Sequence, residues 1–206
     1  MLRVGLTGGI ASGKSSVASL LRDRDYQVLE LDPLGHELLE PGQAAYDEVV
    51  HEFGNVILGP GEKVDRAKLG AIVFSDAAKR ERLNQILHPR ILQVVLQWFS
   101  ALDRPGGPDI AVAEAALLIE AGYQKELDKL IVCWARPDQQ LTRLMERGLS
   151  REQAGLRIAA QMPAEEKRAL ADEVIDCSGS FEETVRQVDM VFAKLQKTAA
   201  GARNKS

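Results

Sequence analysis

Apolar residues along the chain gather in five short runs that contain β-branched side chains. Such runs, bounded by turn residues or charges, are typical of strands buried in a parallel sheet. Between them, apolar residues recur every three or four positions, which is the spacing of a helix with one buried face. Strands that alternate with helices predict a three-layer α/β fold with a parallel five-stranded sheet and right-handed crossovers. The five predicted strands are residues 2–7, 26–31, 109–115, 127–134 and 174–177.

Between the second and third predicted strands the pattern is mainly helical, from residue 34 to about residue 102, with a break at Pro41-Gly42 and a turn-rich loop at residues 54–61. Its last part predicts a long helix over residues 76–102, interrupted or capped near His88-Pro89 because proline lacks a backbone N–H. A segment of this size is too large for a simple crossover. It therefore predicts a helical substrate subdomain inserted at about residues 33–104.

A second helical stretch, at about residues 137–169, follows the fourth predicted strand and is rich in arginine, which is typical of a lid. The predicted core comprises about residues 1–32, 105–136 and 170–198, and it closes with an amphipathic helix at 181–197. We expect insertion, lid and core to form a single domain, because 206 residues suffice for one sizeable core with small subdomains.

The turn after the first predicted strand carries a complete phosphate-binding motif. Gly8 to Ser15 read G-x-x-x-x-G-K-[ST], with an apolar strand before them and helical spacing after them. This context disfavours an ordinary glycine-rich turn. In such a loop backbone N–H groups surround phosphate oxygens, Lys14 reaches the β- and γ-phosphates and the Ser15 hydroxyl binds Mg²⁺. The residues predicted to bind ATP here are Gly9, Ile10, Ala11, Ser12, Gly13, Lys14, Ser15 and Ser16.

Composition and charge argue against several other classes of protein. A content of 45% hydrophobic and 27% charged residues is ordinary for a soluble globular domain. The net charge of −4 argues against general nucleic-acid binding, which favours a basic face. The apolar runs fall short of a membrane span, and the phosphate motif starts too early for a signal peptide. Cys133 and Cys177 form no metal or disulfide framework, so we expect core thiols in a reducing cytoplasm.

Asp32 ends the second predicted strand, at the edge where ligands bind in an open α/β sheet. A carboxylate there can accept the proton of an attacking hydroxyl and orient that hydroxyl toward the γ-phosphate. The pair Asp32-Pro33 is equally typical of a helix start with Asp32 as the N-cap. The pattern leaves both roles open, and the two are compatible.

Arginines of the predicted lid are candidates for holding a triphosphate. Arg143 and Arg147 are four residues apart and so share a helix face, and Arg157 lies further along the lid. Arginines aimed at the phosphates would offset charge during transfer and exclude water. For any one of them the alternative is a solvated helix surface, but the phosphate loop favours a functional role for the cluster.

Glu114 ends the third predicted strand, where phosphate-loop proteins commonly place an acidic residue near Mg²⁺. The alternative, a strand-end carboxylate that faces water, stays open. The three histidines have no metal-ligand spacing with one another or with cysteine, which argues against a metal centre built on histidine.

Over nearly its whole length the chain resembles the dephospho-CoA kinase family. The phosphate loop alone is generic, whereas the set of matching segments in this order is highly specific. Besides Val4 to Ser15, these segments are Asp32 with Gly35-His36-Glu37-Leu38 and Pro41-Gly42, Val64-Asp65-Arg66, Leu69-Gly70, Val73-Phe74, Leu83-Asn84-Gln85-Ile86-Leu87-His88-Pro89, Leu117-Leu118-Ile119-Glu120-Ala121-Gly122, Gln140 with Arg143-Leu144 and Arg147, Arg157-Ile158 with Gln161-Met162, and Ala171-Asp172 through Ile175-Asp176 to Ser178-Gly179-Ser180.

The resemblance implies transfer of the γ-phosphoryl group of ATP to the ribose 3′-hydroxyl of dephospho-CoA, the last step of coenzyme A biosynthesis, with Mg²⁺. It implies that Asp32 is the base and that Arg143, Arg147 and Arg157 are lid arginines. It also implies substrate contacts on the segments that carry His36, Arg66, Asn84 and His88. It makes no prediction of the oligomeric state.

Two positions depart from the family pattern. Glu30-Leu31-Asp32 stands where the family commonly has Asp-Ala-Asp, and Glu114-Ala115-Ala116 lacks the proline of Asp-x-Pro.

Two alternative functions remain beside the transfer to dephospho-CoA. Another small-molecule phosphate-loop kinase would share the loop and the lid but not the Leu-Asn-x-Ile-x-His-Pro segment. A nucleotide-dependent switch would need neither the arginine-rich lid nor an acceptor, and the chain has no Asn-Lys-x-Asp motif for guanine.

Overall fold

The computed structural model describes residues 1–203, and the side chains of these residues except 74, 202 and 203. Five strands form one sheet in the order β2-β3-β1-β4-β5. β1 pairs in parallel with β3 and with β4, and β4 pairs in parallel with β5. The predicted α/β fold and its five strands are confirmed. The strands are β1 Leu2–Thr7, β2 Gln27–Glu30, β3 Ile110–Glu114, β4 Lys129–Trp134 and β5 Glu173–Asp176.

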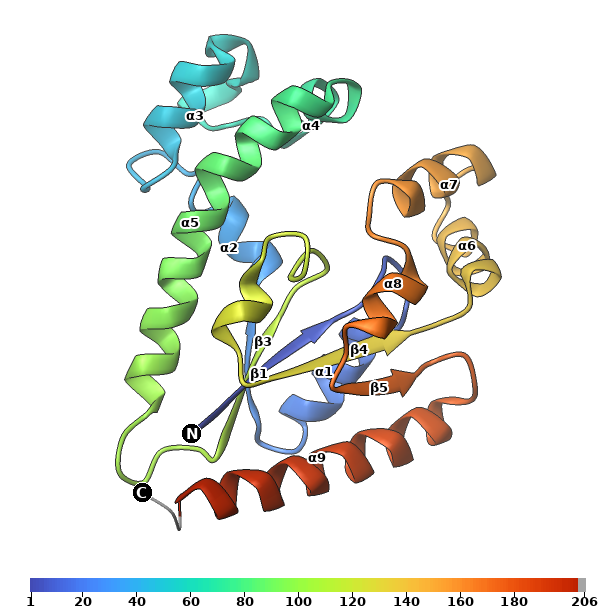
Figure 1. The fold of residues 1–206 in the computed structure, drawn as a ribbon. Helices are drawn as coiled ribbons and strands as arrows, with labels where there is room; N and C mark the ends of the chain where they lie inside the picture. The colour runs from blue at the N-terminus through green and yellow to red at the C-terminus, as the bar shows by residue number, and fades with distance from the viewer. Residues whose placement is uncertain (204–206) are drawn as a thin grey trace. The chain divides into compact units, whose positions relative to one another are not determined.

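Helices occupy the stretches between the strands, as the apolar spacing predicts (Figure 1). The last helix continues to Arg203, beyond the predicted end at Lys197. The α-helices are α1 Lys14–Arg22, α2 Leu31–Glu37, α3 Tyr46–Phe53, α4 Arg66–Ser75, α5 Ala77–Leu102, α6 Pro137–Glu146, α7 Arg151–Ala159, α8 Ala164–Ala169 and α9 Phe181–Arg203. Short 3₁₀ turns lie at η1 Asn55–Ile57, η2 Pro60–Glu62 and η3 Tyr123–Glu126.

The chain divides into two compact units. The phosphate-loop unit contains residues 1–29 and the chain from residue 99 onward, and the helical unit contains residues 30–98. The boundary at residues 98 and 99 falls inside α5. The assignment of a substrate subdomain and a lid concerns ligands, so it stays a prediction.

In the phosphate-loop unit, α1 and α9 pack against the sheet and form one hydrophobic core with it (Figure 1). Leu21 of α1 and Phe192 of α9 are almost completely buried, and they belong to the same cluster as Leu6 and Ile131 of the sheet. Burial of a side chain of this size stabilises the fold by about 1.5–3 kcal/mol. All residues of β3 are buried, as in a parallel strand covered on both faces.

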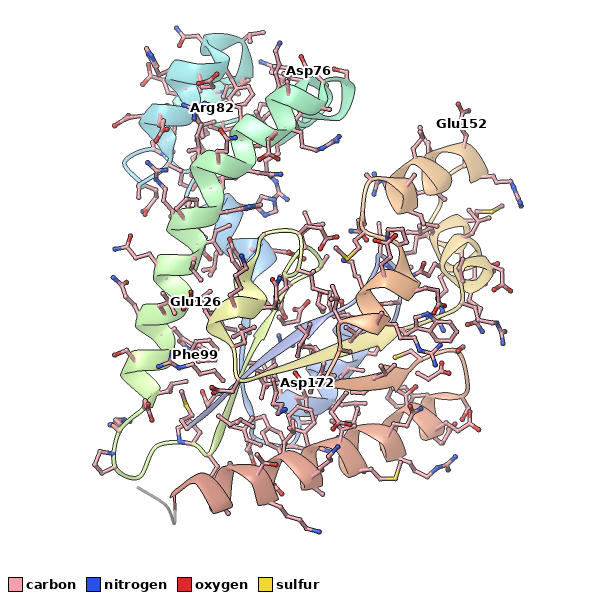
Figure 2. All side chains as sticks on the ribbon, viewed as in Figure 1. Asp76, Arg82, Phe99, Glu126, Glu152 and Asp172 are labelled. Atoms are coloured by element: carbon pink, nitrogen blue, oxygen red, sulfur yellow. The ribbon has the colours of Figure 1, made fainter. Side chains whose placement is uncertain are left out.

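The helical unit has a smaller core and carries ion pairs on its surface. Val49, Ile57 and Ile86 are buried. On the outside, Arg82 of α5 pairs with Glu52 at 2.9 Å and with Glu48 at 3.6 Å (Figure 2). Such exposed pairs contribute little stability, about 0–1 kcal/mol each, so the buried residues mainly hold this unit together.

The predicted interruption near His88-Pro89 is wrong, because α5 runs through Pro89 as one helix. An internal proline removes one backbone hydrogen bond, so neighbouring contacts must hold the helix. Arg90 supplies several of them. Its guanidinium donates to Ala44 O at 2.8 Å, to Ile86 O at 2.6 Å and to the Glu48 carboxylate at 2.6 Å.

Candidate active site

The phosphate loop, residues 8–13, connects β1 to α1. Gly13 is the N-cap of α1 and has a φ of 101°, a conformation that residues with a Cβ rarely adopt. A Cβ at Gly13 would also lie 2.8 Å from the Cβ of Cys177, so the position excludes a larger side chain. Ser12 N donates to Gly9 O at 3.1 Å and closes the turn. Strand, loop and helix therefore follow one another as the motif requires, with the first-turn N–H groups of α1 beside the loop.

Lys14 and Glu114 form a buried ion pair beside this loop. Their side chains are only 10% and 6% exposed, and Lys14 Nζ contacts Glu114 Oε1. The strand register explains the meeting, because Leu6 of β1 lies opposite Glu114, the last residue of β3. The alternative that Glu114 faces water is wrong. Each charge is paired, as burial requires. The Ser15 residue, one position after Lys14, is exposed.

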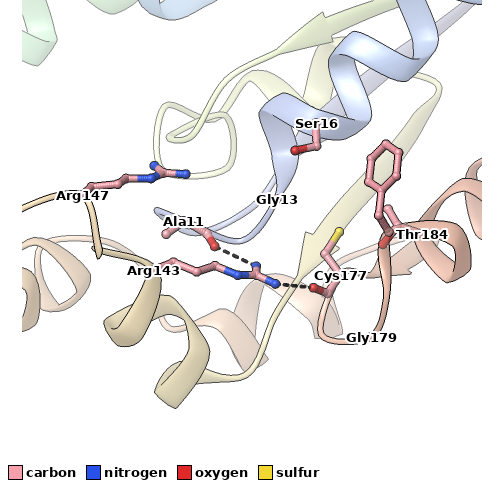
Figure 3. A pocket seen from close by; sticks show the side chains of 9 residues that line it. Ala11, Gly13, Ser16, Arg143, Arg147, Cys177, Gly179 and Thr184 are labelled. Carbon is pink, nitrogen blue, oxygen red and sulfur yellow. Dashed lines mark hydrogen bonds between the residues drawn. The ribbon is translucent and has the colours of Figure 1, made fainter. Parts of the chain in front are cut away.

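A cavity of about 270 Å³ opens beside the loop and is lined by residues from α1, α6 and the segment after β5 (Figure 3). Arg143 connects two segments of the cavity wall, because Nη1 donates to Ala11 O at 3.1 Å and Nη2 donates to Cys177 O at 2.7 Å. A solvated helix surface is therefore the wrong description of Arg143. Arg147 points toward the same loop in Figure 3 and also lines the cavity. The lining residues are Ala11, Gly13, Ser16, Arg143, Arg147, Cys177, Gly179, Phe181 and Thr184.

Arg157 differs from these two arginines. It lies on α7 and is exposed, and it is not among the described residues that line the cavity. Its role as a lid arginine stays a prediction.

Sequence reasoning missed the part of the cavity that follows β5. Cys177 and Cys133 are buried and unpaired, which confirms the expectation of core thiols, but Cys177 also lines the cavity. Hydrogen bonding between the two thiols and burial raise the pKa of Cys133. That hydrogen bond and the nearby Arg143 lower the pKa of Cys177 despite its burial. The rule that ligands bind at the carboxyl ends of parallel strands could have indicated this segment.

Asp32 belongs to the helical unit and is exposed. β2 ends at Glu30, and α2 begins one residue later with Glu30 as its N-cap. Asp32 therefore lies within the first turn of α2, so the N-cap role is wrong. The role as base stays a prediction.

The helical unit contains a cavity of about 500 Å³ with mostly apolar walls. Leu39, Leu69 and Leu83 line it together with His36 and Arg66, so the fold brings these two predicted substrate residues together. Burial and the nearby Arg66 lower the pKa of His36, whereas Asp32 raises it by a smaller amount.

Asn84 and His88 are not among the described residues that line this cavity, although both lie half-buried on α5 one turn apart. Burial lowers the pKa of His88, and Glu81 opposes this shift. Their predicted contacts with substrate stay predictions.

Within residues 1–203, no group of three or more His, Cys, Asp or Glu side chains could hold a metal ion by itself. In the same part of the chain, no helix is long and apolar enough to cross a membrane.

Known proteins match both the sequence and this fold. A family model described as dephospho-CoA kinase matches residues 2–183. A dephospho-CoA kinase of Geobacillus kaustophilus (strain HTA426) is 44% identical over 188 residues, which cover 91% of this chain and 93% of that protein. The solved structure of TT1252 from Thermus thermophilus has a TM-score of 0.79 at 35% identity, over 94% of this chain and 97% of that one. A dephospho-CoA kinase from Campylobacter jejuni has a TM-score of 0.71 at 27% identity, over 95% and 98% of the two chains. The chain therefore belongs to the dephospho-CoA kinase family.

Proposed function

We propose that this protein transfers the γ-phosphoryl group of ATP to the ribose 3′-hydroxyl of dephospho-CoA, which gives coenzyme A and ADP. The observation that carries the proposal is the Lys14–Glu114 pair beside a complete phosphate loop, in a chain of this family. The phosphates of ATP lie on the N–H groups of the loop, and Lys14 contacts the β- and γ-phosphates. The two unpaired cysteines are typical of the reducing cytoplasm, where we place the reaction.

Arg143 and Arg147 offset the charge of the transferred group and exclude water from it. Arg143 is well suited to this role because two backbone carbonyls fix its guanidinium at the cavity wall. Preorganised donors of this kind stabilise charge in the transition state without having to reorganise during the reaction. Arg157 joins them as part of a lid formed by about residues 137–169.

The residues at the loop fit Mg²⁺. The hydroxyl of Ser15 and the carboxylate of Glu114 are hard oxygen donors of the kind that Mg²⁺ prefers, and these two residues would hold the ion. When bound, Mg²⁺ supplies charge neutralisation at the phosphates. Lys14 already provides a cation beside Glu114, so the buried carboxylate has a partner of opposite charge.

The helical unit binds the acceptor. Asp32 accepts the proton of the 3′-hydroxyl and orients its oxygen for in-line attack. The 500 Å³ cavity supports this assignment, because its apolar walls suit an alkyl chain and its Arg66 and His36 suit a phosphate. Asn84 and His88 contribute further contacts. About residues 33–104 therefore form the substrate subdomain.

A purified-protein assay tests the proposal against the two alternatives. ATP consumption is followed with dephospho-CoA, with nucleosides and shikimate, and with no acceptor, and the site of phosphorylation is identified by ³¹P NMR. We expect turnover with dephospho-CoA alone and phosphate on the 3′-oxygen. Turnover with another acceptor would indicate a different small-molecule kinase. Equal hydrolysis without any acceptor would indicate a nucleotide switch.

A further inference from the structure

Gln161 reaches the phosphate loop from the segment between α7 and α8. Its Oε1 accepts a hydrogen bond from Ile10 N at 2.7 Å. Ile10 lies in the middle of the loop, where backbone N–H groups bind phosphate oxygens. The side-chain oxygen of Gln161 thus occupies the place that an oxygen of an anion would take on this N–H.

A buried anchor holds the segment that carries Gln161. The side chain of Lys167 is completely buried, and its ammonium contacts Glu120 Oε1 at 2.8 Å and donates to Ala116 O at 2.6 Å. The same Glu120 oxygen accepts a hydrogen bond from Met162 N at 3.0 Å. Because a buried charge without a partner is costly, this network resists opening. Gln161, next to Met162, is therefore held beside the loop in the absence of nucleotide.

The polar groups around the loop are incompletely satisfied. Among the described residues, Ser12 Oγ and Gln140 Nε2 are buried and have no hydrogen-bond partner. A Cβ at Gly9 would lie 2.7 Å from Gln140 Nε2, so this amide group borders the loop. Buried polar groups without partners are uncommon and need an explanation. A ligand rich in oxygen atoms would supply the acceptors that are missing here.

We propose that Gln161 is a phosphate-binding residue of the nucleotide site. When a nucleotide binds, a phosphate oxygen replaces Gln161 Oε1 on Ile10 N, and the Nε2 group of Gln161 donates to the same phosphate. The neutral carboxamide suits both states, since it accepts from the loop when the nucleotide is absent and donates to the anion when it is present. This inference rests on the proposed function, because it assumes that the loop binds the phosphates of ATP.

The alternative is that Gln161 only fastens the segment to the loop. Replacement by glutamate separates the two roles, because a carboxylate still accepts from Ile10 N but cannot donate and repels a phosphate. Gln153 offers a matched control. It lies in the same arginine-rich region, and its Oε1 also accepts a backbone hydrogen bond, from Ser150 N at 3.0 Å. Gln153→Glu makes the same chemical change away from the loop.

The experiment compares wild type, Gln161→Glu, Gln161→Met and Gln153→Glu. Calorimetric titrations with ATP and with adenosine, without acceptor, are combined with kcat for dephospho-CoA and with thermal melts. A hydrogen bond to a charged group contributes enough that we expect Gln161→Glu to weaken ATP binding by about tenfold or more. Adenosine binding and the melting temperature of this variant should match wild type. Gln161→Met should weaken ATP binding less, and Gln153→Glu should match wild type throughout.

Two results would overturn the inference. If Gln161→Glu keeps wild-type ATP affinity and kcat, the residue does not bind phosphate. If it loses adenosine and ATP affinity equally, with a lower melting temperature, its role is to fasten the segment. Failure of the proposed function is distinguishable from both, since wild type would then bind ATP but not phosphorylate dephospho-CoA.

Discussion

The phosphate-loop unit and the helical unit present several of their candidate residues in different ways. In the first, Lys14 and Glu114 are buried against each other, and Arg143 is bonded to two carbonyl groups. In the second, Asp32 and His36 are exposed. Side chains that stabilise developing charge work best when they are fixed beforehand. A side chain that must meet an incoming hydroxyl needs access instead. On the proposed function, this difference means that the donor site is built into the fold, whereas the acceptor site is completed by its ligand.

The largest effect is expected at Lys14. On the proposed function, Lys14→Met removes a cation from the transferring phosphoryl group, and kcat should fall by an amount like that of losing an arginine finger, about 10³–10⁵. The variant also leaves the buried Glu114 without its partner, a change that typically costs about 3–5 kcal/mol of stability. Steady-state turnover and urea unfolding measure the two effects.

The double variant Lys14→Met/Glu114→Gln separates them. It should regain most of the lost unfolding free energy but none of the activity. Lys129→Met is the matched control, because Lys129 pairs with Asp172 at the surface (Figure 2). Near-wild-type turnover of a folded Lys14→Met protein would contradict the phosphoryl-transfer function.

A smaller but still large effect is expected at Asp32. Asp32→Asn should lower kcat by about 10²–10⁴, the usual contribution of a general base. Stability should change little, because Asp32 is exposed and is not the N-cap of α2. Asp47→Asn provides the control, since Asp47 is also an exposed acid in the first helical turn of α3. If Asp32→Asn turns over like Asp47→Asn, the base lies elsewhere.

Two arginines of the region at about residues 137–169, Arg147 and Arg157, should differ in their effect on turnover. Both effects should be smaller than the effect at Asp32. Arg147 lines the cavity, so Arg147→Ala should lower kcat/KM for ATP by roughly ten- to a hundredfold, as loss of a hydrogen bond to a charged group does. Arg157 is exposed on α7 outside the cavity, so Arg157→Ala should have a weaker effect. Kinetics with varied ATP, with Arg151→Ala as reference, check this order. A larger loss at Arg157 would show that α7 closes over the nucleotide.

The smallest effect concerns pH and stability. Burial lowers the pKa of His88 below its ordinary value of 6.5, so the unfolded chain binds this proton more readily than the folded protein does. The free energy of unfolding should therefore fall as the pH decreases through 6.5. His88→Gln should reduce this dependence in urea unfolding at several pH values. An unchanged slope would show that His36, whose pKa is lowered as well, is responsible.

The sequence predicted β1, β3 and β4 well because these strands are largely buried and form continuous apolar runs that need no partner to be recognised. It also predicted the phosphate loop, since the motif and its context lie within one short segment. The Lys14–Glu114 pair could not be resolved in this way, because it depends on the register between β1 and β3. The open alternatives for Glu114 reflect that missing information.

Other misses have different causes. The N-cap of α2 moved from Asp32 to Glu30 because the helix begins earlier than the Asp-Pro pair indicates. α5 continues through Pro89 because Arg90 forms bonds to residues far away in the sequence. The wall of the 270 Å³ cavity after β5 was missed because Cys177 and Gly179 carry no distinctive chemistry of their own. The Arg90 contacts and the cavity wall after β5 join segments that are distant along the chain, whereas the start of α2 is a local difference.

The reactivity of the buried Lys167 ammonium can report how often the network around this side chain separates. An amine-reactive reagent will modify exposed lysines such as Lys79 and Lys197 promptly, whereas Lys167 reacts only when its network with Glu120 and Ala116 separates. Mass spectrometry of the labelled peptide would give the rate of that separation in the intact enzyme. Comparing the rate with and without ATP would measure whether ATP changes how often this network separates, with no substitution or attached dye.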